Sequence, residues 1–154
     1  MSLTYQLERW AQFWQDCQPL ITIHWKELAL DQEWIPLGVN EERFASVDAL
    51  DMLHILTVRD EGRLVGYFLA IVMPHMHYKD AGPMAFTDMY FIHPDYRIGG
   101  TGAKMLAEVE RTLRARGVVK AYLSTKVHQD HSDLFEKMGW RFTDKAFTKS
   151  FREG

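Results

Sequence analysis

The spacing of hydrophobic residues changes along the chain, and these changes mark the expected helices and strands. Alternation of Leu3, Tyr5 and Leu7 predicts a short first strand. Apolar residues at positions 10, 13, 14 and 17 recur at helical spacing and predict an amphipathic helix. Proline is favoured at the first position of a helix, so Pro19 predicts a second helix that continues to Leu28.

The middle of the chain predicts an antiparallel meander. Asn40 is expected to cap a single helical turn at 41–45. Strands are predicted at 53–59, 64–73 and 84–92, and Asp60-Glu61-Gly62 forms a hairpin turn between the first two. The segment 64–73 is almost entirely apolar, which indicates a central strand buried on both faces.

The last third of the chain predicts a strand–helix–strand unit. A long helix over 99–116 is followed by a strand over 118–125, which a right-handed crossover would make parallel to 84–92. A helix over 130–138 ends at Gly139, and 140–151 supplies one or two closing strands. This order predicts an α/β fold, a mixed central sheet flanked by helices, in a single domain over residues 1–154.

The turn before the long helix carries the most specific chemistry. Amides at a helix N-terminus are unpaired donors, and glycines let an anion approach them closely. A pyrophosphate is the most plausible anion. A P-loop is excluded because Arg97 stands where its first glycine belongs and Ala103 replaces its lysine, and the Gly-x-Gly-x-x-Gly dinucleotide fingerprint is absent.

The turn at 97–103 reads Arg-x-x-Gly-x-Gly-Ala and follows a strand ending in Ile-His-Pro-Asp-Tyr. It resembles the acetyl-CoA signature of the GNAT family of acyl-CoA-dependent N-acetyltransferases. The segment 134–140, Leu-Phe-Glu-Lys-Met-Gly-Trp, resembles the second family signature. The resemblance covers residues 84–152 and implies the GNAT fold, in which two parallel strands splay apart around acetyl-CoA. The loop 75–80 and the overall pattern also resemble GNAT proteins of phages and prophages.

The resemblance also implies which residues bind the cofactor. An open strand edge would pair with the amides of the pantetheine arm, the signature turn would hold the pyrophosphate, and the region around the second signature would complete the site. These residues are Tyr90, Phe91, Ile92, Arg97, Ile98, Gly99, Gly100, Thr101, Gly102, Ala103, His131 and Phe135.

Two residues are candidates for catalysis. Asp88 stands where some relatives keep a glutamate as the base, and in a regular strand it would share a face with Tyr90 and Ile92. As a base it needs a raised pKa or an intervening water, and the alternative is a cap or a salt bridge at the sheet. His128 lies near a family position that contacts the cofactor, and a solvated loop histidine is the alternative.

One position departs from the family pattern. The usual tyrosine that protonates the leaving thiolate is replaced by Phe135. A thiolate of pKa about 8.5 can leave without a positioned acid. Otherwise His128, His131 or Tyr122 would substitute.

Other residues are expected around the acceptor. The loop 75–80 and the helix residues His24, Trp25 and Glu27 would border its pocket, although Trp25 is also explained as helix core. Two alternating histidines, His75 and His77, would make only an incomplete metal site, so no metal is expected.

Composition limits the class of protein. The net charge of −3 argues against nucleic acid as a main partner. The single Cys17 forbids an internal disulfide and suits a reducing cytosol. No apolar run approaches the roughly 18 residues of a membrane span, and the N-terminal segment, with Glu8 and Arg9, does not have the pattern of a signal peptide. We therefore expect a cytoplasmic protein without membrane contact.

These observations predict an acetyl-CoA-dependent N-acetyltransferase that modifies a primary amine. The acceptor, a small molecule or a protein lysine, is left open, and the resemblance allows a homodimer. The alternative is a non-catalytic acyl-CoA-binding or interaction module, which Phe135 favours.

Overall fold

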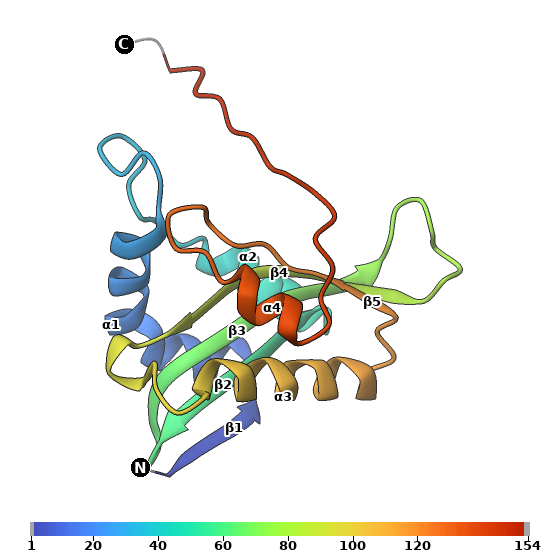
Figure 1. Cartoon of the computed structure of the whole chain (residues 1–154), viewed down its shortest axis with the longest axis horizontal. Helices are drawn as coiled ribbons and strands as arrows, with labels where there is room; N and C mark the ends of the chain where they lie inside the picture. Colours follow the sequence, from blue (N-terminus) through green and yellow to red (C-terminus); the bar gives the residue numbers. More distant parts are fainter. Residues whose placement is uncertain (1, 153–154) are drawn as a thin grey trace. The chain divides into compact units, whose positions relative to one another are not determined.

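A mixed β-sheet runs through the first part of the chain in the computed structural model, which describes residues 2–152 (Figure 1). Among these residues the sheet has five strands in the order β1-β2-β3-β4-β5. The first four are antiparallel neighbours, and β5 runs parallel to β4, as predicted. The strands are β1 (Leu3–Leu7), β2 (Leu53–Asp60), β3 (Arg63–Pro74), β4 (Pro83–Ile92) and β5 (Lys120–Tyr122).

The chain divides into two compact units, Met1–Ser124 and Thr125–Gly154, and each is described by itself. The first unit holds the sheet, α1 (Trp10–Leu28), α2 (Glu41–Ala49), the short 3-10 helix η1 (Pro94–Tyr96) and α3 (Thr101–Ala115). The second holds α4 (Ser132–Lys137). One domain over residues 1–154 stays a prediction. No helix within residues 2–152 has the length and apolar character needed to cross a bilayer.

The prediction of two helices divided at Pro19 was wrong, because α1 continues through that proline. An internal proline removes one backbone hydrogen bond and costs about 3 kcal/mol. The buried residues Phe13, Cys17, Ile21 and His24 nevertheless continue in one helical stripe on both sides of it. Burial of that uninterrupted stripe against the sheet offsets the cost of the proline.

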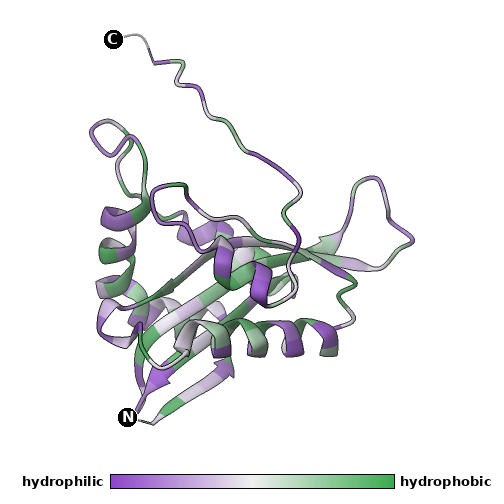
Figure 2. Ribbon diagram, viewed as in Figure 1, coloured by the Kyte–Doolittle hydropathy of each residue, from purple (hydrophilic) through white to green (hydrophobic). Residues whose placement is uncertain are grey.

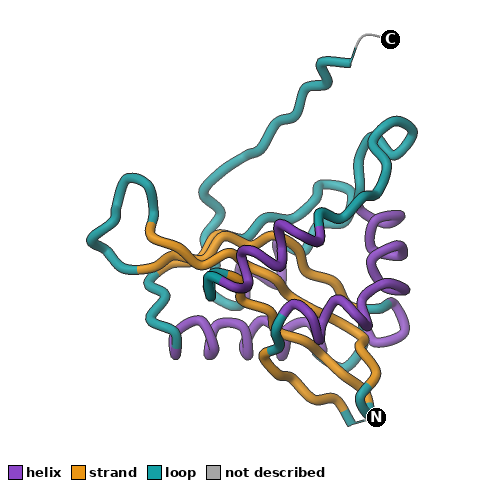
Figure 3. Tube along the Cα trace, turned by 180° about the vertical axis from the view of Figure 1, so that it is seen from behind, coloured by secondary structure: helices purple, strands orange, loops and turns teal. Residues whose placement is uncertain are grey.

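The helices of the first unit cover both faces of the sheet (Figures 1 and 3). Ile55 packs in the cluster formed by α1, while its neighbour His54 places Nε2 2.9 Å from the Thr112 hydroxyl of α3. Adjacent strand residues point to opposite faces, so α1 and α3 lie on opposite sides. Phe44 and Val47 of α2 pack against the same cluster as α1.

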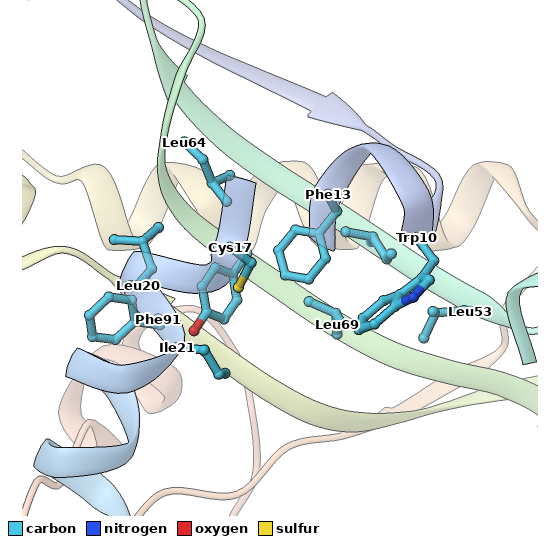
Figure 4. Packing of buried hydrophobic residues seen from close by; sticks show 11 residues of the cluster. Trp10, Phe13, Cys17, Leu20, Ile21, Leu53, Leu64, Leu69 and Phe91 are labelled. Carbon is cyan, nitrogen blue, oxygen red and sulfur yellow. The ribbon is translucent and has the colours of Figure 1, made fainter. Parts of the chain in front are cut away.

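Aromatic rings form much of the core beneath α1 (Figure 4). Trp10 stacks on Phe44 of α2 with ring centroids 4.6 Å apart, and Phe13 meets Tyr67 of β3 edge-on at 5.2 Å. Phe13 and Tyr67 have no exposed surface. These rings join α1, α2 and the centre of the sheet in one cluster.

Three predicted boundaries shift in the structure. Asn40 caps α2 by accepting from the Arg43 amide at 3.1 Å, but the helix runs for nine residues rather than one turn. The helix α3 begins at Thr101, because the left-handed backbone of Gly99 and Gly100 cannot belong to it. The fifth strand keeps only the three residues that pair with β4.

The prediction of closing strands over 140–151 was wrong. These residues contain no strand and lie extended after α4, where hydrophobic and hydrophilic residues intermix (Figures 2 and 3). Phe142, Phe147 and Phe151 are exposed. Phe142 and Phe147 are five positions apart, so in a regular strand they would point to opposite faces and could not form one apolar face.

Candidate active site

A glycine turn joins the end of β4 to α3. After Ile92 the chain forms η1, whose Tyr96 hydroxyl donates to Asp60 of β2 at 2.6 Å. Gly99 and Gly100 follow with φ of 59° and 76°, and Gly100 is the N-cap of α3. This left-handed backbone is readily adopted only by glycine. The turn is therefore fixed by its backbone and by the tyrosine anchor.

The turn can bind an anion. A Cβ atom added at Gly99 or Gly100 would meet nothing within 4 Å, so open space lies against this backbone. The first-turn amides of α3 have no acceptor within the helix and carry its positive dipole. Donors, dipole and space together fit a pyrophosphate.

The strands beside the turn separate as the family resemblance implied. All of β5 pairs with the first part of β4, from Met84↔Lys120 to Phe86↔Tyr122. Beyond that point β4 continues for six more residues, through Ile92. The Tyr90 hydroxyl donates to the Ser124 carbonyl at 2.8 Å, across the widening gap. The edge of β4 from Thr87 onward is thus open to a ligand that pairs like a strand.

Asp88 lies at an irregularity in β4. Met89 pairs with Leu69 and Thr87 with Ala70, so Asp88 is the extra residue of a β-bulge. A bulge re-aims side chains, and alternation alone therefore does not place Asp88 on the face of Tyr90. The residue is exposed, yet protein atoms around its carboxyl displace enough water to raise its pKa above 3.8. A raised pKa is what a general base at this place requires.

Arg97, the first residue of the signature, is held by other parts of the protein. Its Nη2 lies 2.6 Å from both carboxylate oxygens of Glu27 in α1. Its Nε donates to the Ile92 carbonyl at 2.8 Å. The guanidinium carbon lies 5.4 Å from the ring centroid of Phe91. Arg97 thus links the turn to α1 and to the end of β4.

Phe91 also contacts α1 through His24. The two rings stack with centroids 4.9 Å apart, and His24 Nδ1 lies 2.8 Å from the Tyr67 hydroxyl. Burial lowers the pKa of His24 to about 4, so the ring is neutral at pH 7. His24 is therefore part of the core and does not line a solvated pocket.

The second unit holds the remaining predicted residues. His128 lies in the tight turn closed by the bridge between Lys126 and Gln129, and it is exposed. His131 precedes α4, and its carbonyl accepts from the Phe135 amide at 3.2 Å. The rings of His131 and Phe135 have centroids 6.3 Å apart. The structure thus brings these two together within the second unit.

Aromatic rings gather at the paired end of β4 and β5, beside the β3–β4 loop. Phe86 and Tyr122 stack almost parallel with centroids 5.1 Å apart, and His75 lies 6.0 Å from the ring of Phe86. The Tyr78 ring stands 4.7 Å from that of His75. His75 Nδ1 accepts from the His77 amide. Within residues 2–152, no three histidine, cysteine or acidic side chains are grouped to hold a metal ion.

Sequence reasoning missed the partners of several site residues. It identified Glu27 and Arg97 separately but not their pairing, and it missed the Ser124 carbonyl that receives Tyr90. Glu27 and Arg97 are 70 positions apart, and no local pattern signals a pair at that separation. An aspartate within an apolar strand was the only available sign of the bulge.

The chain resembles proteins of one enzyme family. A family model described as the acetyltransferase (GNAT) family matches residues 6–140. A search of curated protein sequences found no match.

Solved structures with the same fold include three with named activities or ligands. A ribosomal-protein-alanine N-acetyltransferase from Brucella melitensis biovar Abortus 2308 has a TM-score of 0.71 and 16% identity, over 98% of this chain and 100% of that one. Glucosamine-6-phosphate N-acetyltransferase from Arabidopsis thaliana has a TM-score of 0.72 and 14% identity, over 99% of this chain and 100% of that one. A predicted acetyltransferase with acetyl-CoA from Clostridium acetobutylicum has a TM-score of 0.67 and 15% identity, over 97% of this chain and 96% of that one. At these identities the likeness shows the fold alone.

Proposed function

The chain belongs to the GNAT family of acetyltransferases, and from that premise we propose that it transfers an acetyl group from acetyl-CoA to a primary amine. The observation that carries the proposal is the turn at 97–103, where two left-handed glycines open the N-terminus of α3 beside the separated edge of β4. The residues present fit the cofactor, because this arrangement offers donors for a pyrophosphate and, for amides, an edge of β4 that continues past its pairing with β5.

The turn and β4 would divide the binding of acetyl-CoA between them. Backbone amides of Gly99, Gly100, Gly102 and Ala103 would hold the pyrophosphate, because the Thr101 amide already donates to the Ile98 carbonyl. Tyr90 would offer backbone groups to the pantetheine arm, whereas the backbone of Phe91 faces β3, as that of His93 does where its amide donates to Val65. The Ile92 carbonyl already accepts from Arg97, so it would have one lone pair left for a ligand. Bound acetyl-CoA supplies the thioester whose acetyl group is transferred.

Asp88 would accept the proton of the amine, directly or through water. A lysine-like amine has a pKa of about 10.4, so at pH 7 its neutral form costs about 4 to 5 kcal/mol. The raised pKa of Asp88 brings the carboxylate closer to the basicity that this transfer requires. The neutral amine would then be able to accept the acetyl group of acetyl-CoA, with the CoA thiolate as the leaving group.

Departure of the thiolate does not require an acid at position 135. The Phe135 side chain has no proton to donate, and a thiolate of pKa about 8.5 leaves readily near neutral pH. His128, His131 and Tyr122 are the side chains proposed to protonate it. The Tyr122 hydroxyl lies 4.0 Å from the Met84 sulfur, a weak contact that leaves it able to donate elsewhere.

The acceptor is proposed to be a cationic small molecule or a protein lysine. The net charge of −3 favours approach of a cation. The rings of His75, Tyr78, Phe86 and Tyr122 add a surface on which the body of such a molecule can pack.

The proposal is tested by CoA binding and by turnover. In Gly100→Glu a carboxylate would enter the open space over the turn, and calorimetry should show loss of the CoA binding seen with wild type. Gly117→Glu is the matched control, because Gly117 also has positive φ and open space but lies past the other end of α3. It should bind CoA as wild type does.

Thiol release measured with a panel of primary amines then tests the transfer itself. We expect acetyl-CoA-dependent release with at least one amine and no release with Gly100→Glu. CoA binding without turnover across small amines and lysine peptides would favour the non-catalytic module, and absence of CoA binding by wild type would contradict the proposal.

A further inference from the structure

The signature arginine is already neutralised by a residue of the protein. Nη2 of Arg97 lies 2.6 Å from both oxygens of Glu27, and its Nε–H is used by the Ile92 carbonyl. The side chains of Arg97 and Glu27 are only partly exposed, at 36% and 24%. The positive charge that Arg97 would offer to a phosphate is therefore largely balanced by one carboxylate.

The same contacts fix the end of β4. Arg97 holds the carbonyl of Ile92, the last residue of the strand, and lies over the ring of Phe91. Glu27 lies in the last turn of α1, one turn after His24, whose ring stacks on Phe91. The C-terminal part of α1 thus contacts both the end of β4, through His24, and the start of the turn, through Glu27.

We propose that Glu27 is a positioning residue for CoA binding, which acts by holding Arg97 so that the turn presents its amide donors in the binding geometry. In this proposal Arg97 holds the turn in place, and the backbone amides of the turn bind the pyrophosphate. This inference rests on the proposed function, because it concerns the same cofactor turn.

Removal of the Glu27 charge distinguishes positioning from direct binding by Arg97. If Arg97 bound the pyrophosphate itself, Glu27→Gln would free a cation and also make the protein less negative, and both changes would tighten CoA binding. If Glu27 positions the turn, the same substitution loosens Arg97 and weakens binding. The two roles therefore predict changes of opposite sign.

The measurement is calorimetry with CoA alone, on wild type, three single variants and one double variant. We expect Glu27→Gln to bind CoA about fivefold more weakly, the scale of a partly exposed ion pair. Glu108→Gln is the matched control, since it removes the same charge and a comparable pair with Arg111, at 2.7 Å, elsewhere on the surface. It should bind within about twofold of wild type.

Arg97→Lys provides the second variant. Lysine keeps the charge but cannot bridge a carboxylate and a backbone carbonyl with the geometry of a guanidinium. We expect Arg97→Lys to weaken CoA binding about as much as Glu27→Gln, and the double variant to be little weaker than either. A melting curve for each protein checks that it is folded.

The outcomes separate this inference from the proposed function. Weaker binding in Glu27→Gln and Arg97→Lys, with Glu108→Gln unchanged, supports positioning. Wild-type or tighter binding by Glu27→Gln overturns it while leaving the proposed function intact. A wild type that does not bind CoA overturns both.

Discussion

At the scale of single residues, Asp88 combines a candidate catalytic role with a cost in stability. It is the extra residue of the β4 bulge, and loss of hydration raises the pKa of its carboxyl. The folded protein therefore disfavours the ionised form that a base must have at neutral pH. Perturbed pKa values of this kind are common at functional sites, where the reaction requires a protonation state that burial alone would not favour.

Asp88→Asn should lower activity and raise stability. We expect kcat/KM to fall about 10²-fold or more, the usual contribution of a general base, with CoA affinity little changed. A raised folded pKa means that ionisation removes stability as pH rises above 3.8, so Asp88→Asn should melt at a higher temperature than wild type at pH 7 but not near pH 3.

Glu42→Gln is the control for Asp88, because it removes an exposed carboxylate from α2, which has no part in the proposed site. It should leave kcat/KM near the wild-type value. Full activity of Asp88→Asn across the pH range would remove Asp88 from the mechanism.

At the scale of elements, a buried ion network joins β1, β2 and α1. Glu8, just after β1, accepts from Arg59 Nε at 2.8 Å and from the Thr57 hydroxyl. Arg59 also pairs with Asp16 of α1 at 2.9 Å. The Glu8 and Arg59 side chains are 0% and 7% exposed. Arg59 therefore links β2 to Glu8 at the end of β1 and to Asp16 of α1, in addition to the backbone pairing of β1 with β2.

Glu8→Gln should destabilise the protein by about 3 kcal/mol, because it leaves the buried Arg59 guanidinium with only the partly exposed Asp16 as a charged partner. Burial raises the pKa of Glu8, but hydrogen bonds from Arg59, Thr57 and Gln6 outweigh it, so the net pKa is lowered below 4.5. Its contribution is thus present above pH 4.5 and lost as the pH falls through the folded pKa.

Denaturant unfolding at pH 7 measures the effect of Glu8→Gln. Glu33→Gln, in the exposed loop after α1, is the control and should change the free energy of unfolding by less than about 0.5 kcal/mol. Equal stability of the two variants would show that the buried network contributes no more than a surface charge.

At the scale of the whole molecule, two neutral histidines make stability depend on pH. His24 is on the buried face of α1 and His54 of β2 lies beneath α3, and they are 8% and 2% exposed. Burial lowers the pKa of each to about 4. Between pH 6.5 and 4 these histidines bind protons in the unfolded chain but stay neutral in the folded protein. Each histidine therefore lowers the free energy of unfolding by up to about 3 kcal/mol over this range.

The melting temperature should therefore fall steeply as the pH is lowered from 6.5 to 4.5. His54→Gln keeps a donor for Thr112 but cannot be protonated, so its melting temperature should fall less over this range. His77→Gln, at an exposed loop position, should follow the wild-type curve. A wild-type melting temperature that is constant over this range would contradict the prediction.

Elements formed by local rules were predictable from the sequence. Alternation identified β1, continuous apolar character identified β3, and Asn40 identified the start of α2. Prediction failed where burial of a longer apolar stripe outweighed a local preference, and where a segment had no regular apolar face to bury. Pro19 did not end α1 because the apolar stripe continued, and the segment 140–151 formed no strand because its phenylalanines keep no alternation.

The sequence by itself determined the glycine turn, the helix behind it and the family to which the chain belongs, because these depend on residues a few positions apart. Only the tertiary structure decided that Arg97 is paired with Glu27, that Asp88 is a bulged residue with a raised pKa, and that Tyr90 reaches Ser124 across the opening of the sheet. Each of these depends on strand register or on a charge tens of residues away. Register and long-range pairing are set by the packing of the whole core, and no short stretch of sequence encodes them.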